Sequence, residues 1–215
     1  ELFTDIKEDA KLINSASLSL DEVLDIIFDS TAKGLSVARV HTGDPSMYGA
    51  IREQMVALDK EGIEYEVIPG VSSVFAGAAA MKKEFTLPGV TQTLILTRMA
   101  GRTPVPEAES IENLAKIQAS MAIFLSIASI DELAKKLMTS YPKDTPAAVV
   151  YKASWPDQKI IVSTLECIAD KVKEADINKT ALVYVGRFLA DEFELSKLYD
   201  KHFSHEFREA QDARR

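Results

Sequence analysis

Two glycine-containing turns carry the residue types best suited to binding a small molecule. The first is residues 41–48 (HTGDPSMY), and the second is residues 69–73 (PGVSS). Glycine allows a tight backbone, while threonine, serine and aspartate side chains supply hydrogen-bonding groups. A plainer interpretation is that Asp44 caps a helix whose first residue is Pro45. The turns alone leave both interpretations open.

The elements around these turns favour a binding crevice. Residues 35–40 (LSVARV) and 64–68 (EYEVI) are short valine-containing runs that predict buried strands. Each run leads into a turn and then into apolar residues at helical spacing, which stop at Gly62 in the first case and near Met81 in the second. Alternating strands and helices predict a parallel sheet, in which both turns open onto the same edge.

The helix after the second turn places Gly77 among alanines (FAGAAA). A glycine inside a helix costs about 1 kcal/mol relative to alanine, so some close contact should justify it. Packing against a neighbouring strand and contact with a ligand both remain open. A helix upstream of the first turn begins with the capping-box pair Ser19 and Glu22 and ends at Gly34.

A second set of strands and helices follows residues 85–92 (FTLPGVTQ), where a Pro-Gly pair interrupts both periodicities. We predict strands at 93–97, 121–125, 147–151, 159–164 and 181–185, and helices at 111–118, 130–141 and 165–175. The strands at 147–151 and 159–164 should pair as an antiparallel hairpin. The expected fold class is therefore α/β, with domains at residues 1–88 and 89–190 and a charged tail at 191–215.

Composition excludes several classes of function. Lys and Arg total 25 against 33 Asp and Glu, so the net charge of −8 offers no basic field for nucleic acid or an anionic membrane. The single cysteine, Cys167, excludes an internal disulfide and fits a cytoplasmic protein. The three histidines have no zinc-site spacing, so we expect no metal. No phosphate loop or dinucleotide fingerprint occurs. Ser72 and Ser73 lack a nucleophile-elbow motif and an assignable His-Asp partnership, which argues against a hydrolase.

Four motifs resemble the tetrapyrrole methylases of cobalamin biosynthesis. In chain order they are VHTGDPSMYG, VIPGVSSVFAGAAA, LPGVTQTLILTR with AGRTPVPE, and VVYKASWPDQKI. The resemblance covers nearly the whole chain, and the GRTPVP loop points to the branch that methylates carbon 11 of precorrin-4. It implies two α/β domains with S-adenosylmethionine in the cleft between them, and a homodimer. The family's opening strand and glycine-rich GAGPGD-type loop are not found in this chain.

The resemblance also assigns roles to residues. The expected cofactor contacts are Thr42, Gly43, Asp44, Met47, Ser72, Ser73, Leu125, Ser126 and Ala153. A tetrapyrrole that carries many carboxylates requires cations, and the candidates on loops that follow strands are Arg98, Arg102 and Lys152, with Arg187 ranked after them. Methyl transfer to a ring carbon is an in-line displacement that depends mainly on alignment, so no catalytic triad is required. Asp44 and Tyr48 are candidates for removing a proton from the methylated ring.

Three alternatives stay open at this stage. The same fold could methylate another ring position or another acceptor, such as a modified protein histidine. The chain could instead be a non-catalytic binding module that has lost the first cofactor loop. A nucleotide-binding α/β domain of another kind ranks lower, because no phosphate loop is present.

Overall fold

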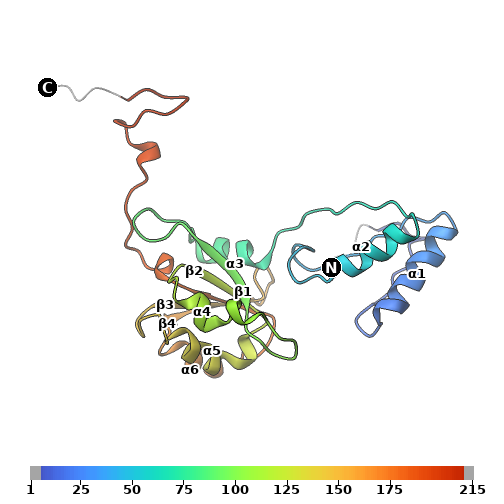
Figure 1. The fold of residues 1–215 in the computed structure, drawn as a ribbon, viewed down its shortest axis with the longest axis horizontal. Helices are drawn as coiled ribbons and strands as arrows, with labels where there is room; N and C mark the ends of the chain where they lie inside the picture. Colours follow the sequence, from blue (N-terminus) through green and yellow to red (C-terminus); the bar gives the residue numbers. More distant parts are fainter. Residues whose placement is uncertain (1–5, 211–215) are drawn as a thin grey trace. The chain divides into compact units, whose positions relative to one another are not determined.

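The computed structural model describes residues 6–210 and divides into two compact units, Glu1–Ser72 and Ser73–Arg215 (Figure 1). The division falls where the helix α3 (Ser73–Met81) begins, because Val74 and Ala78 of this helix are buried in the core of the second unit. The domain boundary expected at residue 88 stays a prediction, since compactness alone does not define a domain.

The first unit is built on two helices. α1 (Leu20–Ala32) begins at a complete capping box, which confirms the sequence prediction. The Ser19 hydroxyl accepts the Glu22 N–H at 3.3 Å, and the Glu22 carboxylate accepts the Ser19 N–H at 2.7 Å. α2 (Ile51–Lys60) begins after Ala50, which has a left-handed backbone with φ 50°. The prediction that Asp44 and Pro45 open this helix is therefore wrong.

The two strands predicted in the first unit are also not formed. Among the described residues, 35–40 and 64–68 have no ladder partner and run as irregular chain. A strand requires a hydrogen-bonded neighbour, and the described part of this unit supplies none, so apolar patterning alone is insufficient. These segments border a groove of about 740 Å³ against α1 and α2, and they leave Val37 and Val67 about 40–50% exposed.

The second unit holds a five-stranded sheet in the order β1-β2-β5-β3-β4. Its strands are β1 (Leu94–Arg98), β2 (Ser120–Phe124), β3 (Pro146–Tyr151), β4 (Lys159–Thr164) and β5 (Ala181–Val185). All five strands were predicted, and β3 and β4 form the expected antiparallel hairpin. β1 and β2 are parallel, whereas β5 lies between β2 and β3 and is antiparallel to both. The sheet is therefore mixed.

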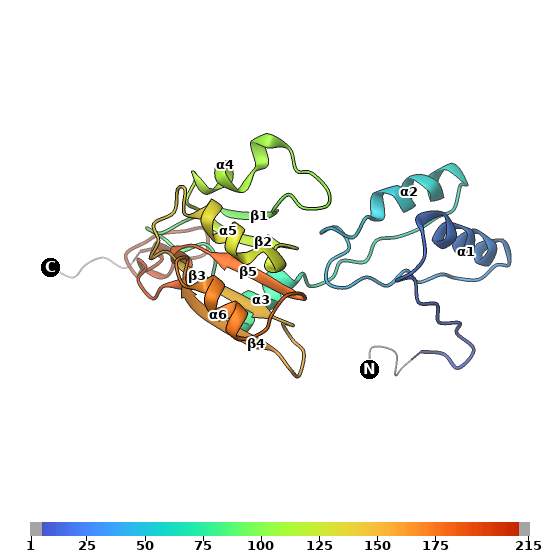
Figure 2. The same cartoon turned by 90° about the horizontal axis from the view of Figure 1, so that it is seen from below.

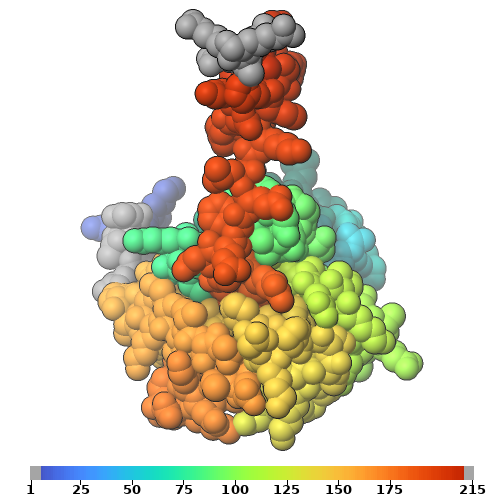
Figure 3. Space-filling model, turned by 90° about the vertical axis from the view of Figure 1, so that its left-hand side faces the viewer, coloured from blue at the N-terminus to red at the C-terminus, as the bar shows by residue number. Residues whose placement is uncertain are grey.

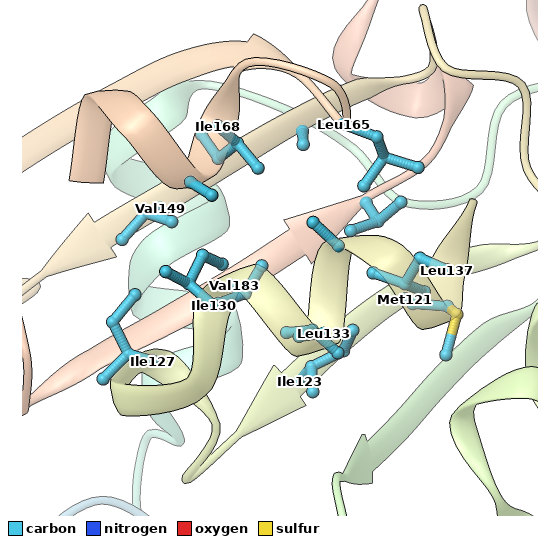
Figure 4. Packing of buried hydrophobic residues seen from close by; sticks show 14 of the residues in the cluster. Met121, Ile123, Ile127, Ile130, Leu133, Leu137, Val149, Leu165, Ile168 and Val183 are labelled. Atoms are coloured by element: carbon cyan, nitrogen blue, oxygen red, sulfur yellow. The ribbon is translucent and has the colours of Figure 1, made fainter. Parts of the chain in front are cut away.

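Helices cover both faces of this sheet (Figures 1 and 2). Side chains alternate between the faces, as a pleated strand requires. Met121 and Ile123 of β2 belong to the cluster that also holds residues of α4 (Ile111–Ala115), α5 (Ile130–Leu137) and α6 (Ile168–Glu174), and Figure 4 shows them beside Leu137 and Leu133 of α5. Ala122 points to the other face, where it belongs to the same cluster as Val74 of α3. The second unit thus has three layers around two apolar clusters.

Short elements and the tail depart from some expectations. Single 3-10 turns occur at Glu107–Glu109, Ile127–Ser129, Arg187–Leu189 and Lys197–Tyr199. The sequence spacing of Ser129 and Glu132 also predicts a capping box, but Ser129 precedes α5 without a side-chain cap, so that prediction is wrong. Cys167 falls within the helix predicted at 165–175, which suggested a small buried apolar group, but it is exposed where α6 begins. The apolar residues of the tail could have formed a short docking helix, but the described tail, red in Figure 3, leaves Leu195 and Tyr199 more than 80% exposed.

Candidate functional site

Asp44 joins the two glycine-containing turns of the first unit. Its Oδ1 accepts the Ser46 N–H at 2.9 Å and also the Ser46 hydroxyl, which closes the first turn. Its Oδ2 accepts the N–H of Gly70 at 3.0 Å, across 26 positions of the sequence. The sequence predicted that the turns lie together at a sheet edge. They do lie together, but a carboxylate rather than a sheet holds them.

Glycine is required on the second turn because the two backbones touch. A Cβ at residue 70 would overlap the carbonyl oxygen of Gly43 and lie 3.4 Å from the Cα of Asp44. Gly43 itself has a φ of 70°, a conformation that favours glycine. The two glycines therefore allow the close approach on which the Asp44 bond depends.

The surroundings of Asp44 affect its candidate role as a base. Hydrogen bonds from the Ser46 hydroxyl and then from the Gly70 N–H hold the pKa of this carboxyl below its ordinary value. A lowered pKa favours the ionised form and makes the group a weaker proton acceptor. Tyr48, the other candidate, is 45% exposed in a left-handed backbone with φ 58°. Of the two nearby cofactor candidates, Thr42 is exposed and Met47 is half-buried.

In the second unit, three strands end at one edge of the sheet and carry most of the remaining candidates. β1 and β2 are parallel, and β2 and β3 are both antiparallel to β5, so the carboxyl ends of all three meet there. The residues that follow β2 and β3, Leu125 and Lys152, have positive φ angles of 53° and 46°. Left-handed backbone is strained for these residue types, and such strain often marks functional loops. Leu125 is also 75% exposed.

Ser126 connects two loops at this edge. It is only 2% exposed, and its hydroxyl accepts the Met99 N–H at 3.0 Å while donating to the Phe124 carbonyl at 2.7 Å. This hydroxyl ties the chain after β1 to the chain after β2. A ligand contact at Ser126 would therefore use the backbone.

The remaining expected cofactor contacts differ in burial and location. They are Ser72, Ser73 and Ala153. Ser72 is buried at the end of the first unit, and Ser73 is exposed as the first residue of α3. Ala153 is partly buried against the apolar cluster that contains Val74 of α3. Within the second unit, the start of α3 and the loop after β3 thus contribute to one cluster.

Some of the predicted substrate-binding cations already bond to nearby residues, whereas others remain available for a ligand. The Arg98 guanidinium donates to the carbonyls of Met99, Thr103 and Pro104 at 3.3, 3.1 and 2.7 Å, so it shapes its own loop. Arg102, in the same loop, is exposed and has no hydrogen bond or ion pair to any described residue. Arg102 is therefore available for a ligand carboxylate.

Lys152 is held by three side chains that sequence reasoning did not connect to it. Its ammonium lies 2.5 Å from Asp157 Oδ2 and 5.1 and 5.3 Å from the ring centroids of Tyr151 and Trp155. The bond to Asp157 raises the pKa of the lysine, which keeps it charged. The motif KASWPDQ contained the signal, because it places a cation, an aromatic ring and a carboxylate on one short loop.

Arg187 lies at the opposite edge of the sheet. It follows β5, whose last residue Val185 pairs with the start of β2 and β3 at Met121 and Ala147. Arg187 was a candidate because it lies on a loop that follows a strand, and such loops share one edge only when their strands are parallel. The antiparallel β5 reverses this one loop.

The donor set of these loops fits a cofactor such as S-adenosylmethionine. The first unit offers backbone amides, the Thr42 hydroxyl and an ionised carboxylate within two joined turns. In the second unit the exposed loop at Leu125 offers backbone groups, whereas the N–H of Lys152 already donates to the carbonyl of Thr180 at 3.0 Å. Such groups suit the amino, carboxylate and hydroxyl groups of a small polar ligand.

Comparison with known proteins places the chain in a family. Residues 1–169 match the model of the Tetrapyrrole (Corrin/Porphyrin) Methylases. The chain belongs to the tetrapyrrole methylases. A cobalt-precorrin-4 C(11)-methyltransferase from Methanocaldococcus jannaschii is 52% identical over 206 residues, which span 95% of this chain and 80% of that protein. A precorrin-4 C(11)-methyltransferase from Pseudomonas aeruginosa is 45% identical, spanning 92% and 80%.

A solved tetrapyrrole methylase has the same architecture. The X-ray structure of a cobalt precorrin-4 methyltransferase, described as a cobalamin biosynthetic enzyme, superposes with a TM-score of 0.83 and 46% sequence identity. The match covers 85% of this chain and 77% of that one. The predicted α/β fold is confirmed. Within residues 6–210, no helix is long and apolar enough to cross a membrane.

Proposed function

We propose that this chain transfers a methyl group from S-adenosylmethionine to carbon 11 of precorrin-4, with or without cobalt in the ring, during cobalamin biosynthesis. The observation that carries this proposal is the 52% identity to a cobalt-precorrin-4 C(11)-methyltransferase across 95% of the chain. At that identity and coverage, the joined turns and the loops after β1, β2 and β3 all lie inside the matched region.

We assign the cofactor to loop residues of each unit. S-adenosylmethionine supplies a methyl group activated by its sulfonium. In the first unit, Thr42, Gly43, Asp44, Met47 and Ser72 would bind it, with Asp44 keeping the two turns together through Gly70. The second unit would contribute Ser73, Leu125, Ser126 and Ala153, of which Ser126 would use its backbone. Orientation by these loops would provide most of the rate enhancement.

The substrate carboxylates would bind to cations at the edge where β1 to β3 end. Arg102 is the residue best placed to do so, because it is exposed and unengaged among the described residues. Its planar guanidinium can hold a carboxylate in a bidentate manner. Arg98 and Lys152 would act by keeping their loops in shape, since their charged groups already bond within those loops. We further propose that the protein is cytoplasmic and that it forms a homodimer. Light scattering on the purified protein would test the homodimer.

A methyl-transfer assay tests this function. The full chain is incubated with ¹³C-methyl-labelled S-adenosylmethionine and with precorrin-4 or cobalt-precorrin-4, and the product is examined by mass spectrometry and NMR. We expect one added methyl group at carbon 11. A methyl at another carbon would support the alternative ring position. Binding of S-adenosylhomocysteine without transfer would support a non-catalytic module, and competition by ATP would support a nucleotide-binding domain.

A pair of arginine variants tests the substrate assignment. Arg102→Ala should raise KM for the tetrapyrrole about tenfold or more, because a charge-assisted hydrogen bond is lost. Arg187→Ala is the matched control, since this arginine is also exposed but lies at the opposite edge of the same sheet. Equal effects of the two variants would contradict the assignment.

A further inference from the structure

A buried tyrosine hydroxyl fixes the first turn of α3. Tyr184 lies in β5 between Ala122 and Ala148 of the neighbouring strands, and these small side chains leave room on that face of the sheet. The tyrosine is fully buried. Its hydroxyl lies 2.8 Å from the carbonyl oxygen of Ser73 and 3.0 Å from that of Val74. One proton is thus shared by two carbonyls at the start of the helix.

Gly77 is the counterpart of this tyrosine on the helix. A Cβ at residue 77 would overlap the Tyr184 hydroxyl oxygen and lie 2.7 Å from Cζ of the ring. In a regular helix the Ser73 carbonyl also accepts the N–H of residue 77, so the tyrosine and the glycine meet at the same carbonyl. The close contact that the sequence required at Gly77 is therefore packing on a strand.

The ring of Tyr184 is itself held in place. Phe85 stacks on it with ring centroids 6.2 Å apart and an interplanar angle of 23°. A phenylalanine at position 184 would fill the same space and bury no polar group, so packing alone does not require the hydroxyl. Burial raises the pKa of the phenol, so the hydroxyl stays protonated and able to donate.

We propose that Tyr184 is a positioning residue for cofactor binding. By bonding to the Ser73 and Val74 carbonyls, it sets the position of the first turn of α3 and of Ser73. The proposal rests on the proposed function, which assigns Ser73 to the cofactor. Tyr184 itself does not need to touch the ligand, because its effect is transmitted through the helix backbone.

Two isosteric variants test the proposal. Tyr184→Phe removes the hydroxyl that bonds to α3. Tyr141→Phe is the matched control, because Tyr141 is also buried and its hydroxyl donates to the Ala119 carbonyl at 2.6 Å, within the cluster on the other face of the sheet. Affinity for S-adenosylhomocysteine is measured by calorimetry, and KM for S-adenosylmethionine and kcat are measured on the full chain. Amide hydrogen exchange reports on α3 separately.

We expect a loss confined to cofactor binding in one variant. Tyr184→Phe should weaken S-adenosylhomocysteine binding about fivefold, raise KM for S-adenosylmethionine to a similar extent and leave kcat nearly unchanged, as loss of one hydrogen bond predicts. Exchange of the α3 amides should become faster in this variant only. Tyr141→Phe should match wild type in all of these measurements.

Three results would count against the proposal in distinguishable ways. Equal affinities in the two variants would overturn the role of Tyr184 and leave the proposed function standing. Faster exchange in α3 without any change of affinity would show that the hydroxyl serves the fold alone. Failure of the wild-type protein to bind S-adenosylhomocysteine would overturn both the positioning role and the proposed function.

Discussion

The two units of this chain form from similar sequence patterns but reach different states. Both contain short apolar runs that lead through turns into helices. In the second unit such runs become five hydrogen-bonded strands with fully buried side chains such as Ile123 and Val149. In the first unit the described runs at 35–40 and 64–68 stay unpaired, and α2 has no buried residue.

This difference shows that strand formation is a property of neighbouring chains. Apolar alternation provides a surface to bury, but the backbone N–H and C=O groups also require partners. The second unit provides both through adjacent strands and two helical layers. The described part of the first unit instead uses a capping box at Ser19 and a long-range bond, from the Gly70 N–H to the Asp44 carboxylate.

Core truncation should give the largest contrast between the units. Leu133→Ala removes a fully buried side chain of α5, which should lower the free energy of unfolding of the second unit by about 2–5 kcal/mol. Urea unfolding followed by fluorescence reports on this unit, because Trp155 is the single tryptophan. Leu24→Ala in α1 is the control and should leave that transition within about 0.5 kcal/mol of wild type. Equal shifts would show that the fluorescence transition does not report on the core of the second unit alone.

A smaller effect is expected at the contact between α3 and the sheet. Gly77→Ala should lower the free energy of unfolding by up to about 2 kcal/mol, because overpacking costs about 1–3 kcal/mol and the gain in helix propensity offsets about 1 kcal/mol of it. The same urea titration measures it. Gly101→Ala is the control, since nothing lies within 4 Å of a Cβ built there. Stabilisation by Gly77→Ala would show that α3 moves away from Tyr184 at little cost.

The link within the first unit should depend on pH. The pKa of Asp44 is lowered below its ordinary value of 3.8, so its bond to Gly70 is fully formed above that value and is lost as pH falls through the lowered pKa. The amide proton shift of Gly70, followed by NMR, should titrate in that acidic range. Asp44→Asn should abolish the transition, and the amide of Gly62 should show none in wild type. A Gly70 transition above 3.8 would contradict the bond.

The smallest effect on stability is expected at Arg102. Arg102→Ala removes an exposed side chain without a described partner, so the free energy of unfolding should change by less than about 0.5 kcal/mol. Arg98→Ala removes a guanidinium that bonds to three loop carbonyls and should cost about 1 kcal/mol. Urea unfolding of the two variants and of the wild type measures both changes in the free energy of unfolding. A larger loss at Arg102 than at Arg98 would reverse the assignment of the two arginines.

Sequence reasoning succeeded where the chemistry is local. The capping box at α1, the five strands of the second unit and the hairpin of β3 and β4 follow from periodicity and turn residues. The family motifs identified the tetrapyrrole methylases, and the family comparison confirmed this. The site residues stay predictions, although the structure gathers the loops after β1, β2 and β3 at one edge.

Other features required the tertiary structure, because they join residues far apart in the sequence. The antiparallel insertion of β5 moved Arg187 to the opposite edge, and no local pattern specifies strand direction. Asp44 was predicted to cap a helix but bonds to Gly70, and Lys152 was predicted to be available but is held by Asp157. The sequence determined which residues have the chemistry to bind a ligand. Only the packing of the chain decided which of those groups are already engaged, because each hydrogen bond requires a partner that folding brings within reach.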